Sequence, residues 1–249
     1  MANASSTTVE KHPVHEELAG YEGAKLGMWL FLATELLLFG VLFALFAIFH
    51  AKYVEEFKLA HHSLNKIMGG LNTIILILSS LTVALGLDAV QRGKRKRANA
   101  LLFATILFAS GFLVVKYFEY SEKFHHGIRP GNAPMIVVDD ATHEFVPSRT
   151  RDEENRIGED GKKIGPMIVH GHPIRRAGLD LFFTFYFIMT GVHGLHVLIG
   201  MTVLAIVLRK NMQGRYTHWY YTPVENGALY WHLVDLIWIY LFPLFYLIK

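Results

Sequence analysis

Five runs of mostly apolar residues, separated by polar stretches, set the pattern of this chain. About 20 apolar residues are needed for a helix to cross the hydrocarbon core of a bilayer. The five runs that reach this length are Leu26–Phe49, Leu71–Val90, Ala98–Tyr117, Leu179–Leu208 and Leu229–Ile248. The fourth run is overlong, so we expect it to be tilted or to extend beyond the membrane. The pattern predicts an all-α integral membrane bundle of five transmembrane helices.

We treat residues 1–249 as a single membrane domain, in which the segments between the apolar runs are polar. Residues 1–25 form a polar N-terminal tail without the basic and short apolar regions of a cleaved signal peptide. Residues 121–178 form a long loop between the third and fourth helices, with a charge cluster at Arg149–Lys163. Its hydrophobic patterning is weak, as at Met135–Val138, and the loop could form a short hairpin or contact a partner. A loop of this length is expected to be functional or partly disordered.

Basic residues in the short loops indicate the orientation of the helices. The dense run Arg92–Arg97 joins the second and third helices, and Arg209, Lys210 and Arg215 follow the fourth. Cytoplasmic loops carry an excess of Lys and Arg, whereas long loops cross the membrane largely regardless of charge. We therefore expect a cytoplasmic N-terminus, an extracytoplasmic C-terminus and an extracytoplasmic long loop.

Composition narrows the function classes. The chain is 52% hydrophobic, and it contains no cysteine. The absence of cysteine excludes disulfides, iron–sulfur clusters, thiolate-bound copper and covalent haem attachment through a C-x-x-C-H motif. The formal net charge of +3 gives no overall electrostatic support for binding nucleic acid.

Ionisable side chains inside the apolar runs are the candidate functional residues. Such groups cost at least ~2.5–3.5 kcal/mol to insert, so they usually face the protein interior. The candidates for a buried polar network with a proton-related or lipid-related role are Glu35 in the first run, His193 and His196 in the fourth, and Glu225, His232 and Asp235 in the fifth. Lys116 and Glu119 lie at the outer end of the third run, where lysine can extend to the interface.

Each candidate has a structural interpretation beside the functional one. His193 and His196 share a helical face and could ligate a metal or haem, but interhelical hydrogen bonding is the simpler interpretation, because a metal site needs further ligands. His232 and Asp235 could form an acid–base pair or a structural pair within one helix. Glu35 must be protonated, paired or hydrated in its apolar run, which leaves a lipid-related or proton-related role and a structural hydrogen bond both open.

Two motifs near the C-terminus carry a resemblance to a known family. They are F-I-M-T-G-V-H-G-L-H-V-L-I-G, which ends at Gly200, and Y-W-H-L-V-D-L-I-W, which ends at Trp238. They resemble the signatures of subunit III of the haem–copper terminal oxidases of the cytochrome c oxidase type. Glu35 in its apolar run, L-N-T-I-I-L-I-L-S-S-L-T in the second helix and V-K-Y-F-E-Y in the third are similar to the family as well. The chain departs from the longest members, which have seven helices, and its long loop is unusual.

The resemblance implies a subunit without redox centres, and we expect no catalytic, cofactor-binding or metal-binding residue in this chain. Haem and copper would lie in the partner subunits I and II, and the complex would be the enzyme, reducing oxygen to water with cytochrome c as electron donor. The family's third subunit packs against subunit I, binds phospholipids and supports proton uptake and turnover stability. The helix count implies the shorter bacterial form, and therefore a bacterial inner membrane.

Three alternatives remain open from the sequence. The same fold could serve a quinol oxidase or a nitric-oxide reductase assembly. The chain could be a free-standing intramembrane metalloenzyme that uses His193, His196 and Glu35. It could also be a transporter, although it shows no internal repeat and no paired helices broken by Gly or Pro.

Overall fold

The computed structural model describes residues 13–137, 145–147, 167–169, 172–217 and 219–247. Within these residues, five helices are long and apolar enough to span a membrane, which confirms the predicted all-α membrane fold. They are α1 (Pro13–Lys52), α3 (Lys66–Gln91), α4 (Arg95–His125), α6 (Arg176–Met212) and α7 (Thr222–Tyr246). Helix α1 begins inside the segment expected to be a polar tail, and α4 continues into the segment expected to be a loop.

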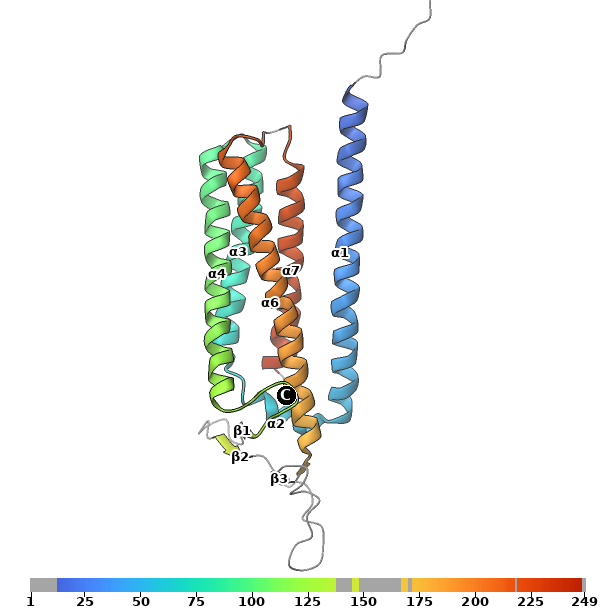
Figure 1. The fold of residues 1–249 in the computed structure, drawn as a ribbon, viewed down its shortest axis with the longest axis vertical. Helices are drawn as coiled ribbons and strands as arrows, with labels where there is room; N and C mark the ends of the chain where they lie inside the picture. Colours follow the sequence, from blue (N-terminus) through green and yellow to red (C-terminus); the bar gives the residue numbers. More distant parts are fainter. Residues whose placement is uncertain (1–12, 138–144, 148–166, 170–171, 218, 248–249) are drawn as a thin grey trace, which may run out of the picture.

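Helices α3, α4, α6 and α7 form a bundle in which α3 packs on α4 and α7, and α6 packs on the same two helices. Helix α1 stands at the edge of this bundle and contacts α6 and α7 (Figure 1). Figure 1 shows α6 inclined to α4. At 37 residues, α6 is about 55 Å long by its helical rise, well beyond a hydrocarbon core of about 30 Å. The fourth span is therefore longer than the hydrocarbon core, as expected, and it is one continuous helix.

Local signals define several helix ends. Asn65 caps α3, because its side-chain oxygen accepts hydrogen bonds from the backbone N–H of Ile67 at 3.0 Å and of Met68 at 3.2 Å. Gly93 and Gly214 occupy the left-handed region, with φ of 68° and 79°, at the turns that follow α3 and α6. These two turns and the N-terminal end of α1 lie at the same end of the molecule (Figure 1).

The opposite end carries short elements. Helix α2 (Val54–His61) follows α1 and buries Phe57 completely. Strand β1 (Met135–Val137) pairs antiparallel with β2 (Phe145–Pro147), and β3 (Met167–Val169) pairs with β4 (His172–Ile174). The hairpin predicted at Met135–Val138 is therefore present over its first three residues. Val138 and the charge cluster Arg149–Lys163 lie outside the described residues.

Aromatic side chains fill the bundle interior. Trp231 and Trp238 of α7 are fully buried, and their indole nitrogens donate to Ser79 Oγ at 3.0 Å and to Thr73 Oγ1 at 3.1 Å. Buried tryptophan needs such a partner, which explains why hydroxyl side chains line the facing side of α3. The aromatic core fixes α7 against α3 and so positions the polar groups of α7.

Candidate functional site

Glu35 and His196 meet where α1 packs on α6. Glu35 Oε2 lies 2.7 Å from His196 Nε2, and both side chains are largely buried. His196 Nδ1 lies 2.8 Å from the carbonyl oxygen of Val192, which can only accept, so Nδ1 carries a proton. The 2.7 Å contact is therefore a hydrogen bond between Nε2 and Oε2.

The surroundings of this pair are aromatic. The ring of Phe39 meets His196 edge-on at a centroid distance of 5.4 Å. The hydroxyl of Tyr230 donates to the backbone carbonyl of His196 at 3.2 Å. The pair is therefore anchored from α1, α6 and α7, and it ties the peripheral helix α1 to the bundle.

His193 lies apart from His196, although only three residues separate them. Its ring packs between Phe112 at 5.6 Å and Trp238 at 5.2 Å, and it is fully buried. Neither ring nitrogen has a hydrogen-bond partner within the described part of the chain. The expected interhelical hydrogen bond is present for His196 and not for His193.

Glu225 is a partly exposed residue near the start of α7. It forms an ion pair of 2.9 Å with Lys25 of α1, and the two side chains are 21% and 32% exposed. The pair lies near the start of α7, about two turns before His232 and about three turns before Asp235. It connects the N-terminal half of α1 to the bundle at the end that carries the short turns.

His232 and Asp235 do not form the expected pair within one helix. His232 Nδ1 contacts Ser80 Oγ of α3 at 2.7 Å. Asp235 is 3% exposed, and the Ser80 hydroxyl lies close to it, but neither of its carboxylate oxygens has a hydrogen bond of ordinary distance and angle in the ranges that the structure describes. Both residues line a cavity of about 450 Å³ between α3 and α7. The six candidate residues thus lie in four separate places instead of one network.

The sequence missed the most polar cluster of the bundle, which surrounds Lys116 and Glu119. Lys116 Nζ lies 3.0 Å from Glu119 Oε2 and donates to the hydroxyls of Tyr186 and Tyr246 at 3.1 Å each. Glu119 is fully buried, and its Oε1 accepts from Tyr186 at 2.7 Å and from Tyr246. Lys116 therefore points into the bundle, and the expectation that it extends to the interface is wrong. The signal available was the i, i+3 pair of opposite charges in an apolar run.

A second lysine and a hydroxyl chain adjoin this cluster. The buried Lys123 donates to the backbone carbonyl of Ser63 at 2.9 Å. Thr190 Oγ1 donates to the carbonyl of Tyr186 at 2.5 Å, so the Tyr120 hydroxyl, 2.5 Å from Thr190 Oγ1, is the donor in that contact. The Lys123 bond joins α4 to the turn after α2, and the Tyr120 bond joins α4 to α6.

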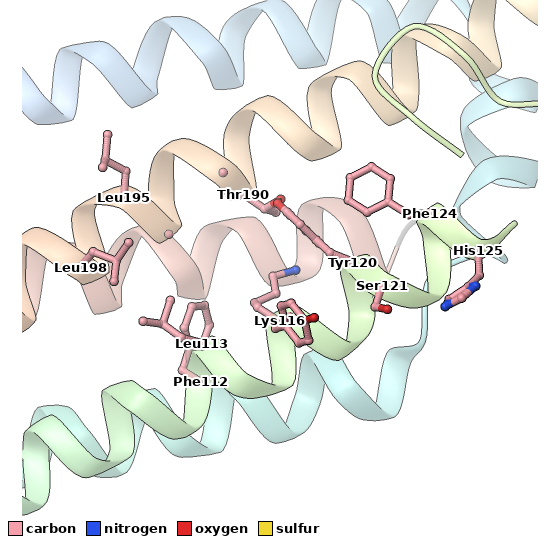
Figure 2. Close-up of a pocket in the computed structure, with 13 residues that line it drawn as sticks. Phe112, Leu113, Lys116, Tyr120, Ser121, Phe124, His125, Thr190, Leu195 and Leu198 are labelled. Carbon is pink, nitrogen blue, oxygen red and sulfur yellow. The ribbon is translucent and has the colours of Figure 1, made fainter. Parts of the chain in front are cut away.

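A cavity of about 640 Å³ between α4 and α6 reaches this cluster (Figure 2). Figure 2 shows Leu113, Leu195 and Leu198 at one end, and Tyr120 and Ser121 at the other. The apolar end lies toward the middle of the helices and the polar end toward the end of α4. The lining is therefore apolar toward the middle of the helices and mixed toward the end of α4, where Phe124 adjoins Tyr120 and Ser121.

No group of three or more His, Asp or Glu side chains that could hold a metal ion occurs among the residues described. In the part of the chain that the structure describes, His193 does not join the Glu35–His196 pair.

Comparison with known proteins decides the family. The sequence model described as "Cytochrome c oxidase subunit III" matches residues 6–127 and 179–249. The chain belongs to the cytochrome c oxidase subunit III family. The unmatched interval lies almost wholly within the long loop, and the matched intervals include the Glu35–His196 pair and the Lys116 cluster. The family predicted from the two C-terminal motifs is confirmed.

Relatives cover most of this chain at low identity. The chain is 26% identical over 223 residues to "Cytochrome bo(3) ubiquinol oxidase subunit 3" of Pseudomonas putida, and the aligned region covers 90% of the chain and 84% of the relative. It is 25% identical over 224 residues to "Cytochrome c oxidase subunit 3" of Thermostichus vulcanus, and the aligned region covers 90% of the chain and 86% of that relative. The protein of the same name from Cyprinus carpio is 28% identical over 176 residues, and the chain spans 48% of that relative's length.

Proposed function

We propose that this chain is the non-redox accessory subunit III of a proton-pumping haem–copper terminal oxidase that reduces oxygen to water. In this proposal it packs on subunit I, while haem and copper are held by subunits I and II. Membership of the subunit III family is the observation that carries the proposal. The chain's own part is structural and lipid-related, and it sustains proton uptake during turnover.

One feature supports a lipid-related role and another supports a proton-related role. The cavity between α4 and α6 has the dimensions and polarity for part of a phospholipid, with an acyl chain along Leu195 and Leu198 and polar groups near Tyr120. Ligand sites of about 300–1,000 Å³ are typical, so 640 Å³ is sufficient. The hydrogen bond between Glu35 and His196 supports a proton-related role, because it joins two side chains that can each carry an exchangeable proton.

The electron donor is proposed as cytochrome c, with quinol as the alternative. The names of the relatives include both a ubiquinol oxidase and cytochrome c oxidases, so they favour neither. Purification of the complex would separate the two, since a copper-containing subunit II among the partners favours cytochrome c. A nitric-oxide reductase assembly would be recognised by its reaction with nitric oxide instead of oxygen.

The orientation is proposed from charge. The basic turn Arg92–Arg97 adjoins the end of α6, because Arg95 Nε donates to the carbonyl of Asn211 at 2.7 Å. Arg209, Lys210 and Arg215 lie beside that contact in the sequence. This dense basic end would face the cytoplasm of a bacterial inner membrane, with the N-terminus inside and the C-terminus outside. Protease accessibility of tags at the two termini tests this orientation.

Substitution of Glu35 tests the role of the chain in turnover. We expect Glu35→Ala to leave the haem content of the complex intact but to shorten the turnover lifetime or reduce the bound phospholipid. Glu35→Gln keeps a hydrogen-bond donor toward His196 and removes the exchangeable carboxyl proton, so it separates the structural contact from the proton-related role. Glu55→Ala on α2, where the side chain is 41% exposed, is the control. An unchanged lifetime and lipid content in Glu35→Ala would refute the proposed role.

A further inference from the structure

The groove between α3 and α7 contains a buried carboxyl group that lacks a well-formed hydrogen bond to any residue the structure describes. Asp235 is 3% exposed, and the Ser80 hydroxyl lies close enough to interact with its carboxyl group, but no hydrogen bond of ordinary distance and angle reaches either oxygen. The neighbouring Ser80 hydroxyl contacts His232 Nδ1 at 2.7 Å. These three polar residues line one cavity of about 450 Å³. Buried polar groups are normally hydrogen-bonded, so this carboxyl group indicates that a partner completes the site.

The depth of Asp235 limits what that partner can be. Asp235 lies 13 residues after Thr222 and 11 before Tyr246, which places it about 20 Å and 16 Å from the two ends of α7. A bilayer core of about 30 Å offers only acyl chains at that depth, and acyl chains donate no hydrogen bonds. A lipid headgroup therefore cannot satisfy Asp235, whereas a side chain from another membrane-spanning helix can.

The surface around the groove fits a helix. The rim consists of apolar side chains that are about half exposed, namely Ile77 and Leu81 of α3 and Leu236 and Ile239 of α7. The opposite side of α7 packs against α6, and α1 also contacts α7. The α3–α7 face thus combines an apolar rim with a polar centre, the arrangement by which polar groups hold helices together inside membranes.

We propose that this groove is the docking site for a membrane-spanning helix of a partner subunit that presents an N–H donor side chain to Asp235. The proposal rests on the proposed function in that the partner is a subunit of the same oxidase. It goes further by assigning one face of the bundle, and one residue, to the contact. Asp235 acts here as a docking residue and has no catalytic role.

Cross-linking in the intact complex tests which molecule occupies the groove. The chain has no cysteine, so single substitutions Leu81→Cys and Ile239→Cys can each carry a photoactivatable reagent into the groove. Leu107→Cys on α4, where the side chain is 62% exposed, is the matched control on another face. We expect both groove positions to label one membrane-spanning peptide of an oxidase subunit that contains an N–H donor side chain. Labelling of lipid alone, or of a second copy of this chain, would overturn the proposal.

A substitution at Asp235 separates docking from folding. Leucine has nearly the same size and leaves no unsatisfied carboxyl group, so Asp235→Leu should not lower the thermal midpoint of the isolated full chain in detergent. The same variant should reduce retention of the chain in the purified complex at least tenfold, as measured by quantitative mass spectrometry. Unchanged retention would overturn the proposal, as would a fall in both retention and stability, which would make the carboxyl group structural.

The two proposals fail in different ways. If the unmodified chain does not co-purify with haem-containing subunits, the proposed function is wrong, whatever the groove contains. If it co-purifies with them and Asp235→Leu is retained fully, the proposed function stands and the docking site is wrong.

Discussion

Replacing Glu119 with glutamine should destabilise the isolated bundle strongly, because it leaves the buried ammonium group of Lys116 without its counterion. The two charges are 3.0 Å apart, and the carboxylate is fully buried. At an effective dielectric constant of 20, their attraction is about 5.5 kcal/mol. Removing one partner of a buried pair costs about 3–5 kcal/mol in measured cases, so we expect Glu119→Gln to lower the free energy of unfolding by that amount.

The structure also predicts how this loss can be recovered. Lys116→Met removes the uncompensated charge, so Lys116→Met combined with Glu119→Gln should cost less than the sum of the two single changes by at least about 2 kcal/mol. The assay is equilibrium unfolding of the full chain in mixed detergent micelles, followed by tryptophan fluorescence. Trp238 suits this purpose, because its ring lies 5.0 Å from Lys116 Nζ.

An exposed pair is the matched control. Arg92 and Asp88 also lie on one helix, 2.8 Å apart, but their side chains are 65% and 47% exposed. Asp88→Asn should therefore cost less than about 1 kcal/mol. Additive effects of the Lys116 and Glu119 substitutions, or equal costs for Glu119→Gln and Asp88→Asn, would refute the assignment of a buried, coupled ion pair.

Two further predictions concern packing between helices. Gly200→Ala should destabilise the chain by about 1–3 kcal/mol, because the added Cβ would lie 2.8 Å from the buried ring of Trp231. Gly40→Ala is the control, because nothing lies within 4 Å of the Cβ that it adds, and it should be neutral or stabilising in the same unfolding assay. Arg95→Ala should lower stability by about 1.5–3 kcal/mol in that assay, because it removes a charge-assisted hydrogen bond of 2.7 Å to the carbonyl of Asn211. A larger loss for Gly40→Ala than for Gly200→Ala, or no loss for Arg95→Ala, would contradict this packing.

The membrane-spanning helices were predictable from the sequence, since hydropathy over about 20 residues depends on composition alone. The short helix α2 was not predicted, because its eight residues alternate between charged and apolar side chains and its burial depends on contacts with α6. The hairpin at Met135 could be foreseen from a local run of β-branched residues.

The candidate site was predictable only in part. The pairing of Glu35 with His196 links residues 161 positions apart, so the sequence could identify both groups and not their contact. His193 faces Phe112 and Trp238 instead, a difference that the relative rotation of α6 determines. The inward direction of Lys116 depends on Tyr186 and Tyr246, which come from two other helices. Residue identity therefore indicated which groups need partners, and packing determined which partners they have.

The most direct test of the central claim is to purify this chain with a tag from its native membranes in mild detergent and to identify its partners. A reduced-minus-oxidised spectrum of the complex should show haem, and mass spectrometry should identify a large polytopic subunit. When this chain alone is stripped from the complex, the haem and copper should remain with the partners. A stripped chain that retains haem or a stoichiometric metal, or a chain without any oxidase partner, would contradict the account.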